Sequence, residues 1–474
     1  MEQTPKKQNK MGHAPMFKLI MSMALPAMFS MIVQACYNIV DSLFVARLGE
    51  EAMTALSLAF PAQMLMVGVG VGTGVGINSL ISRRLGEKRF AEADDAASHG
   101  IFLALCSAMV FALLGIFAAG PFMRAFTENT TVSSMGTTYL SIVMAFSFGS
   151  FIQIATEKVL QGTGNMIFPM VIQLVGAVTN IILDPIMIFG LFGFPALGVA
   201  GAAIATVLGQ ILGMVIGLII VFTKEHEVTP KLRGFRPKMP IVVDIYRVGL
   251  PSIVMQTVGS FLNMGLNTIL IGFSDAAVSV LGSYYKLNSF IFMPVFGLNQ
   301  GLMPVMGYNY GAKNRQRLMH ALRIGCMVAI CIMAVGTLLF WVFPEQLLGI
   351  FSPTPERIAI GVPAFRIISI SFVGAAVSII FSTLFQAIGN GKLSLLVSLL
   401  RQVVILLPSA YFLSKLGVSY VWYAWPLSEG MALFGTLVVF LHLKRTMLAA
   451  LDEGGEDLPA VEAAEMSTSP TPAL

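Results

Sequence analysis

Two acidic residues stand inside long apolar stretches of this sequence, each beside amide side chains that share its side of a predicted helix. Gln34, Asn38 and Asp41 are spaced four and three residues apart, so they share one helix face. Asn180 and Asp184 are four apart and do the same. Burial and a nearby like charge both favour the protonated form of a carboxyl group, and a hard cation prefers carboxylate and amide oxygens. These residues therefore indicate a site for H⁺ or Na⁺.

Other charged residues also fall in apolar runs. Lys286, Arg401 and Glu429 lie in the second half of the chain, where we interpret them as a structural ion pair or triad or as groups that gate a substrate. A charge at the centre of a membrane helix costs roughly 2.5–3.5 kcal/mol, so such charges need a partner or a role. Glu157-Lys158 stands near the end of its apolar run, and we predict a solvated or interfacial pair there.

Motifs for catalysis, metals and nucleotides are missing from the sequence. The five histidines form no pair at metal-ligand spacing, and neither Gly-x-Ser-x-Gly nor His-Glu-x-x-His occurs. Gly68, Gly72 and Gly76 lie four apart and predict close helix packing, because no Gly-Lys-Ser/Thr follows them. We therefore expect no enzyme, no cofactor, no metal beyond a possible Na⁺ at Asp41, Asn180 and Asp184, and no nucleic-acid or ATPase partner.

The elements that carry these residues are predicted to be transmembrane helices. The chain has 474 residues, of which 56% are hydrophobic and only 11% charged, with a mean hydropathy of +0.82. A helix needs roughly 20 apolar residues to cross a bilayer. We predict twelve crossings, at residues 17–46, 52–82, 97–120, 135–162, 167–190, 197–222, 241–272, 278–308, 317–342, 358–388, 393–414 and 421–444.

The distribution of basic residues predicts the orientation. Lysines and arginines gather at the N-terminus, in the loop 83–89, in the linker 224–240 and at 313–323, which all fall on one side of the predicted membrane. The positive-inside rule places this side in the cytoplasm. We expect a multi-pass protein of the cell (inner or plasma) membrane with both termini cytoplasmic. Residues 1–16 form the N-terminus, and 446–474 form an acidic, disordered tail.

An internal repeat divides the chain into two halves. Similar residues recur at a constant separation of 225 positions: Leu25-Pro26 and Leu250-Pro251, Asn38 and Asn263, Gly86 and Gly311, Lys88 and Lys313, Phe126 and Phe351, and Gln161, Gly164 and Asn165 with Gln386, Gly389 and Asn390. Such repeats are typical of transporters that work by alternating access. The repeat predicts an all-α integral membrane fold with an N-lobe (17–223) and a C-lobe (241–445), related by a pseudo-two-fold axis along the membrane normal.

The repeat also places the ion site. At the same separation Asp41 is replaced by Leu266 and Asp184 by Ser409. Neither acid is duplicated, so we expect the coupling-ion site in the N-lobe alone.

Several motifs in this order resemble the multidrug and toxic compound extrusion (MATE) family, in its bacterial branch with N-lobe carboxylates. The similarity extends over residues ~17–445, and the motifs that carry it are Leu25-Pro26, Gln34-x-x-Tyr37-Asn38-x-x-Asp41, Gln161-Gly162-x-Gly164-Asn165, Asn180-x-x-x-Asp184-Pro185 and Gly201-Ala202-Ala203-x-Ala205-Thr206. The resemblance implies six plus six helices around a V-shaped cavity and export of lipophilic, often cationic, drugs in exchange for H⁺ or Na⁺.

The resemblance also implies roles for individual residues. It assigns Asp41, Asn180, Asp184 and Thr206 to the ion site and Pro26 to a bend, or hinge, in the first helix. We assign a second group to the substrate cavity and expect a monomer; this group is Gln34, Tyr37, Asn38, Gln153 and Met64. The branch of the family that keeps acids in the seventh and tenth helices differs here, because those helices carry no matching carboxylate.

Other functions fit parts of this pattern. A flippase or exporter of a lipid-linked or metabolite substrate on the same fold is the nearest alternative, but a basic cavity is expected there. A major-facilitator transporter also has six plus six helices, but the loop Arg83–Arg89 lacks its Asp-Arg-x-Gly-Arg pattern. The natural substrate, and the choice between H⁺ and Na⁺, stay open at this point.

Overall fold

The computed structural model describes residues 9–223, 227–231, 233–351 and 354–446, and within them it contains helices and no strand. The N-terminal half holds α1 (Lys10–His13), α2 (Met16–Ala46), α3 (Glu50–Gly86), α4 (Phe90–Phe117), α5 (Ala119–Phe126), α6 (Thr130–Ala145), α7 (Phe148–Gly162), α8 (Ile167–Phe189), the 3₁₀ turn η1 (Leu191–Gly193) and α9 (Val199–Thr223). The predicted acidic tail lies outside the described residues.

The C-terminal half repeats this order of helices. It holds α10 (Met239–Ile271), α11 (Asp275–Gly311), α12 (Arg315–Val342), α13 (Pro344–Gly349), α14 (Pro355–Ser369), α15 (Ser371–Ala387), α16 (Gly391–Leu399), the π-helix η2 (Leu400–Leu406), α17 (Leu407–Ser414), α18 (Val418–Val421) and α19 (Ala424–Thr446). We call α2–α9 the N-lobe and α10–α19 the C-lobe.

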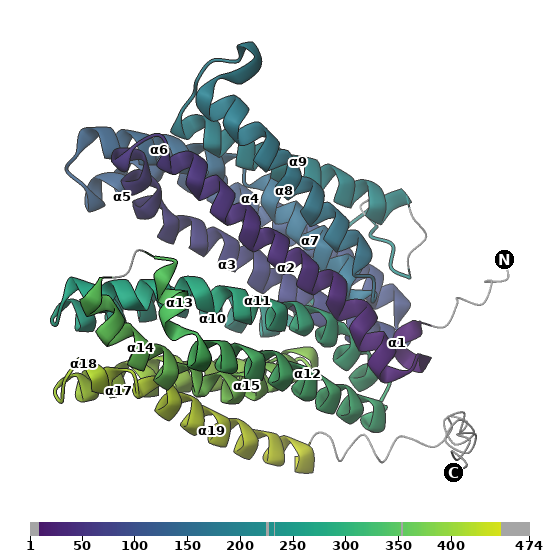
Figure 1. Cartoon of the computed structure of the whole chain (residues 1–474). Coiled ribbons are helices and arrows are strands. Elements are labelled where there is room, and N and C mark those ends of the chain that lie inside the picture. Colours follow the sequence, from purple (N-terminus) through teal and green to yellow (C-terminus); the bar gives the residue numbers. More distant parts are fainter. Residues whose placement is uncertain (1–8, 224–226, 232, 352–353, 447–474) are drawn as a thin grey trace, which may run out of the picture.

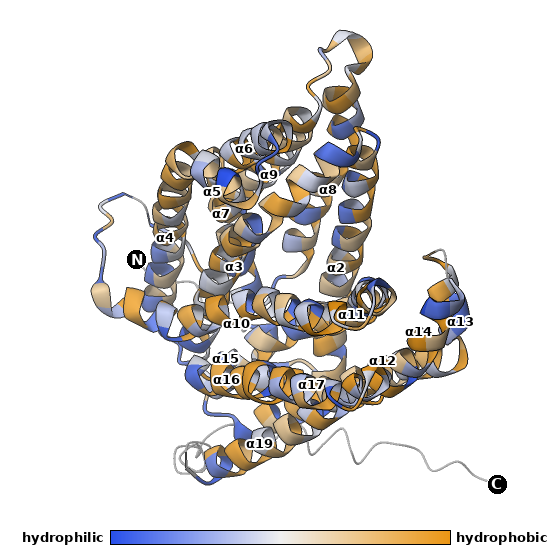
Figure 2. Ribbon diagram, turned by 90° about the vertical axis from the view of Figure 1, so that its left-hand side faces the viewer, coloured by the Kyte–Doolittle hydropathy of each residue, from blue (hydrophilic) through white to orange (hydrophobic). Residues whose placement is uncertain are grey.

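Twelve crossings fit the described helices. Ten are long and apolar enough to span a bilayer alone, and two further spans are bent pairs, α6 with α7 (46°) and α14 with α15 (43°). The predicted all-α fold of twelve transmembrane helices is confirmed. Large apolar side chains face outward, with Phe117 73% and Phe434 72% exposed, as contact with lipid requires. Hydrophobic residues, drawn in orange, run along most of the helices (Figure 2).

Four predicted helices differ in detail. The spans 135–162 and 358–388 are each two helices that meet at a bend. The sequence did not predict these bends because no charge or proline stands at the break, so a window average of hydropathy does not change there. The span 97–120 begins earlier, at Phe90, because its first turns are acidic and dilute the apolar signal. The span 393–414 contains the seven-residue π-helix η2.

The two lobes lie side by side and are drawn from purple to teal and from green to yellow (Figure 1). They approach each other at the end where α1 lies and diverge toward the end of α5, α13 and α14. Across the boundary, α3 packs on α10 and α11, and α2 packs on α11. The first two long helices of each lobe, α2 and α3 in one and α10 and α11 in the other, therefore form the contact between the halves.

Glycines of the repeat make this contact in symmetric pairs. A Cβ atom added at Gly72 would lie 2.5 Å from Ile253, and one added at Gly297 would lie 2.5 Å from the Cα of Met28. Gly297 and Ile253 stand 225 positions after Gly72 and Met28, so both halves of the repeat use the same contact. The close packing predicted for the glycine series on α3 is confirmed at this position.

The contact is tightest where α3 and α11 end, at the side that carries the basic segments 83–89 and 313–323. We call this side the basic end of the molecule. A Cβ atom at Gly86 would lie 2.0 Å from the carbonyl oxygen of Tyr308, and one at Gly311 would lie 2.1 Å from that of Arg83. Backbone therefore touches backbone across the lobes, and only glycine fits.

We expect Gly86→Ala and Gly311→Ala each to destabilise this lobe contact. The added methyl group meets backbone that cannot rotate away, and overpacking of this kind costs about 1–3 kcal/mol. The measurement is the thermal midpoint of the purified protein in detergent. Gly259→Ala on α10 is the matched control, because nothing lies within 4 Å of its added Cβ. Equal midpoints for Gly86→Ala and Gly259→Ala would contradict the close contact.

Candidate functional site

The two N-lobe acids come together in space. Asp41 on α2 and Asp184 on α8 are 143 positions apart in the chain, yet their carboxyl groups lie within hydrogen-bonding distance of each other. Asp184 is fully buried. Two carboxyl groups can share a hydrogen bond only when one of them holds a proton, and two ionised groups at this distance need a cation between them. The geometry suits the binding of one proton or one small cation.

Asn180 connects this acid pair to α9. Its amide nitrogen donates to Asp184 Oδ2 (3.1 Å), and its oxygen accepts from the hydroxyl (3.3 Å) and backbone N–H (3.1 Å) of Thr206. Both side chains are buried, with 2% and 5% exposure. The four residues offer carboxylate, amide and hydroxyl oxygens, which are the ligands of a hard cation such as Na⁺. Among the described residues, this site included, no group of three or more His, Cys, Asp or Glu side chains could hold a metal ion.

Small residues on α9 explain why this helix approaches α8 so closely. A Cβ atom added at Gly201 would lie 2.4 Å from the carbonyl oxygen of Met187, and one added at Gly209 would lie 2.7 Å from that of Gly176. The Gly201-Ala202-Ala203 motif therefore has a packing function, which holds Thr206 against Asn180.

Near the acid pair, Tyr139 and Gln63 were not found from the sequence. Tyr139 on α6 interacts electrostatically with Asp41, Tyr37 and Asp184, and its hydroxyl donates to Gln63 Oε1 on α3 at 3.5 Å. Tyr139 is 4% exposed. A polar ring and an amide in the middle of apolar helices were the available signal, but only the packing of α6 on α3 brings them to the acid pair.

A cavity of about 640 Å³ lies between the lobes, next to the acid pair. It is lined from both lobes, by α2, α3 and α7–α9 on one side and by α10, α11, α15, α16 and η2 on the other. Asn180 and Thr206 form part of its wall, whereas Asp41 and Asp184 are not among the lining residues. The acids therefore lie behind the wall that Asn180 and Thr206 present to the cavity.

All five residues assigned to the substrate cavity line it: Gln34, Tyr37, Asn38, Met64 and Gln153. Gln173 on α8, which the sequence did not single out, also lines it and donates to Gln34. The wall is therefore rich in amides and apolar groups, a composition suited to organic molecules.

The prediction that Glu157-Lys158 is a solvated or interfacial pair is wrong. Both residues line the cavity, and Lys158 is only 8% exposed. Lys158 donates to Gln161 (2.8 Å) and, across the lobe boundary, to Gln300 on α11 (3.3 Å), while Glu157 accepts from Gln153 (3.0 Å). The C-lobe covers this end of α7, which the sequence of α7 alone does not reveal.

The three C-lobe charges do not form a triad. Arg401 and Glu429 are paired at 3.5 Å, whereas the Nζ of Lys286 lies 5.5 Å from the ring centre of Phe351 and belongs to another region. Of the three, only Arg401 lines the cavity.

At the positions that the repeat matches to the acid pair, all of them described, the C-lobe has no acid. The positions 225 residues after Asp41, Asn180, Asp184 and Thr206 hold Leu266, Ile405, Ser409 and Met431, and Leu266 is fully buried. The two lobes therefore differ at these positions in how the side chains pack as well as in residue type.

Pro26 lies within α2, which runs without a break from Met16 to Ala46. The hydroxyl of Ser30 donates to the carbonyl of Pro26 at 3.1 Å. Asp41 stands fifteen residues further, roughly 22 Å at 1.5 Å per residue, so the proline does not contact the acid.

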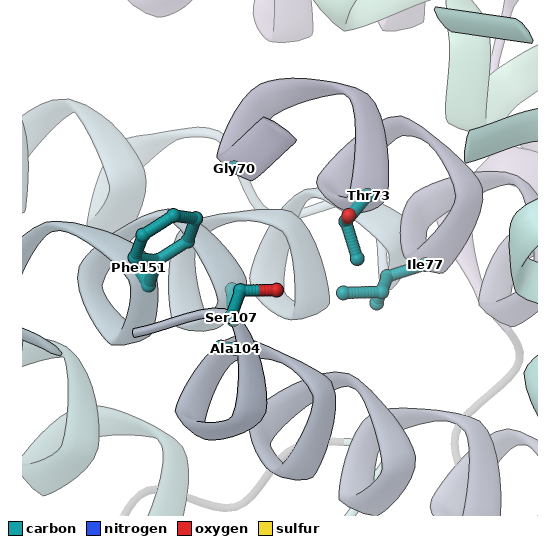
Figure 3. A pocket seen from close by; sticks show the side chains of 7 residues that line it. Gly70, Thr73, Ile77, Ala104, Ser107 and Phe151 are labelled. Carbon is teal, nitrogen blue, oxygen red and sulfur yellow. The ribbon is translucent and has the colours of Figure 1, made fainter. Parts of the chain in front are cut away.

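A second, much smaller cavity lies inside the N-lobe between α3, α4 and α7 (Figure 3). Its volume is about 10 Å³, and Thr73 and Ser107 are the polar residues beside it. This volume matches at most one water molecule, so the inter-lobe cavity is the candidate site for an organic substrate.

The comparison with protein families decides the membership of this chain. The MatE family model matches it twice, over residues 26–186 and 251–412. The two matches begin at Pro26 and Pro251, at the separation of the internal repeat. The chain belongs to the MATE family. It is a member of the multidrug efflux transporters, as its motifs indicated.

Individual relatives agree with this membership. The chain is 26% identical to the multidrug export protein MepA of Staphylococcus saprophyticus, over 90% of this chain and 94% of that protein. Its structure is similar to that of a multidrug resistance MATE family transporter in an outward-facing conformation (TM-score 0.87, 27% identity, 95% of this chain and 100% of the other). It also resembles a MATE crystal structure in a bent conformation (TM-score 0.84, 28% identity, 93% and 97%).

Proposed function

We propose that this MATE protein is a secondary antiporter that exports lipophilic, often cationic, organic compounds in exchange for H⁺ or Na⁺. One observation carries the proposal: the buried Asp41–Asp184 pair adjoins the inter-lobe cavity through Asn180 and Thr206. The site suited to one small cation and the cavity suited to an organic molecule are thus separated only by Asn180 and Thr206. This is the arrangement that coupling requires, because occupation of one site changes the charge facing the other.

The coupling step follows from charge. With the acid pair unloaded, its negative charge attracts an organic cation through the cavity wall. Binding of a proton, or of Na⁺, removes that charge, and the substrate loses its partner. We propose that α2 changes its bend at Pro26 when the pair is loaded, because proline lacks the N–H that would hold the helix at this point. The bend would link the state of Asp41 to the state of the cavity.

The orientation follows from the basic residues. We propose that the basic end of the molecule and both termini face the cytoplasm, in the cell (inner or plasma) membrane. The linker 224–240 between the lobes (17–223 and 241–445) then lies on the same side. Because Gly86 and Gly311 bring the lobes into backbone contact at this end, this conformation is closed to the cytoplasm. The cavity is complete within one chain, which supports a monomer.

The test is ethidium accumulation in everted membrane vesicles, with each gradient imposed alone. An interior that is acidic, or loaded with Na⁺, should drive ethidium inward, and an ionophore that dissipates that gradient should stop it. Vesicles without the protein are the control. Accumulation that responds to neither gradient would contradict the antiport proposal. Accumulation that needs ATP when neither gradient is present would indicate an ATP-driven pump instead.

A further inference from the structure

Arg401 brings a positive charge to the C-lobe side of the cavity. The charged residues among the described lining residues are Glu157, Lys158 and Arg401, and the first two belong to the N-lobe helix α7. Lys158 already donates to the amide oxygens of Gln161 and Gln300. Arg401 is therefore the cationic group on the opposite wall, and the N-lobe wall carries the acid Glu157, with the acid pair behind it.

The backbone around Arg401 is held in an unusual form. Arg401 lies in the π-helix Leu400–Leu406, which ends just before Pro408. Proline cannot donate to the carbonyl four residues earlier and clashes with it, so a wider turn before it relieves the conflict. The hydroxyl of Ser428 on α19 donates to the carbonyl of Arg401 at 2.6 Å. Such turns often occur at functional sites, where they redirect a side chain.

The ion pair with Glu429 leaves much of the guanidinium group available. Arg401 carries five N–H donors, and its contact with Glu429 is a single one at 3.5 Å, between Nη1 and Oε2. In the described part of the chain, the second oxygen of Glu429 has no hydrogen-bond partner. A buried pair that served stability alone would be expected to use both oxygens. Glu429 and Ser428 instead position Arg401, which remains 24% exposed at its side chain.

We propose that Arg401 binds an anionic group of the transported molecule, a carboxylate in the first place. The cation of the same molecule would face Glu157 and the acid pair of the N-lobe. The favoured cargo is then an organic cation that also bears a carboxylate. Arg401 is suited to this because its planar fork forms paired, charge-assisted hydrogen bonds with carboxylates. The inference rests on the proposed function, since it takes the cavity to be the export site.

The probes are two dyes that differ in one group: a rhodamine with a free carboxylate and the methyl ester of the same rhodamine. The observable is the ratio of their dissociation constants, acid over ester, measured by fluorescence polarisation on the purified protein. Arg401→Gln alone would leave Glu429 buried and unpaired, so the informative variant is Arg401→Gln with Glu429→Gln. It should raise the ratio by roughly tenfold or more, as expected for loss of a hydrogen-bonded charge.

Three further variants separate binding from packing. Glu429→Gln keeps the arginine and should leave the ratio equal or lower it. Arg401→Lys keeps the charge without the fork and should give an intermediate ratio. Lys286→Gln, which removes a C-lobe charge outside the cavity, is the matched control and should not change the ratio.

The outcomes distinguish this inference from the proposed function. An unchanged ratio in the double variant, or an equal rise in Lys286→Gln, would overturn the role of Arg401. A wild-type protein that transports neither dye under either gradient would overturn the proposed function instead. Thermal midpoints of all variants are measured alongside, and a ratio that changes only where the midpoint falls would assign Arg401 to packing.

Discussion

Replacing Asp41 with asparagine should abolish gradient-driven export and leave the protein folded. An amide cannot exchange a proton or neutralise a cation, so only the carboxyl of Asp184 is left, and an amide that donates to it holds that carboxyl in its ionised form. The amide still has the size of the acid and can donate to Asp184 across the same short distance. The packing of α2 on α8 should therefore persist, and ethidium accumulation in everted vesicles should fall to that of vesicles without the protein.

The control for Asp41→Asn is substrate binding at equilibrium. The purified variant should elute as a single species and still bind ethidium, because Asp184 keeps a negative charge behind the cavity wall and no lining residue is changed. Accumulation of ethidium at the wild-type rate would show that Asp41 is not part of the coupling site. Loss of both binding and monodispersity would indicate misfolding.

The second large effect is expected at the other acid, with a contrast between the lobes. Asp184→Asn should impair coupled transport severely, because Asp184 is fully buried and accepts from Asn180 at the point where the pair meets the cavity wall. Ser409→Ala, at the equivalent C-lobe position, should be nearly silent, because the positions around it hold Leu266 and Ile405 in place of an acid and an amide. Transport rates under each gradient are the measurement.

The comparison of these two variants tests the asymmetry of the repeat. Both residues occupy the same place in their lobes, so a general disturbance of helix packing would affect both. Equal losses would mean that the ion does not bind in the N-lobe alone.

The features that the sequence determined by itself are those that depend on local composition and on repetition. Hydropathy yields twelve crossings because each helix must satisfy its own backbone inside lipid, whatever its neighbours are. The separation of 225 residues yields the two lobes, and the structure shows the same separation in the Gly72–Ile253 and Gly297–Met28 contacts. Asp41 and Asp184 stood out because a charge in an apolar run is costly.

The tertiary structure decided what those residues touch. The sequence predicts a solvated or interfacial pair at Glu157 and Lys158. In the structure, α11 covers this end of α7 and brings Gln300 to Lys158. Tyr139 lies near the acid pair because α6 packs there. Arg401 pairs with Glu429 and not with Lys286, because the path of the chain places Lys286 in another region. The physical reason is the same in each case. The environment of a side chain in a helix bundle is set by the neighbouring helices, and a linear pattern of residues does not specify which helices those are.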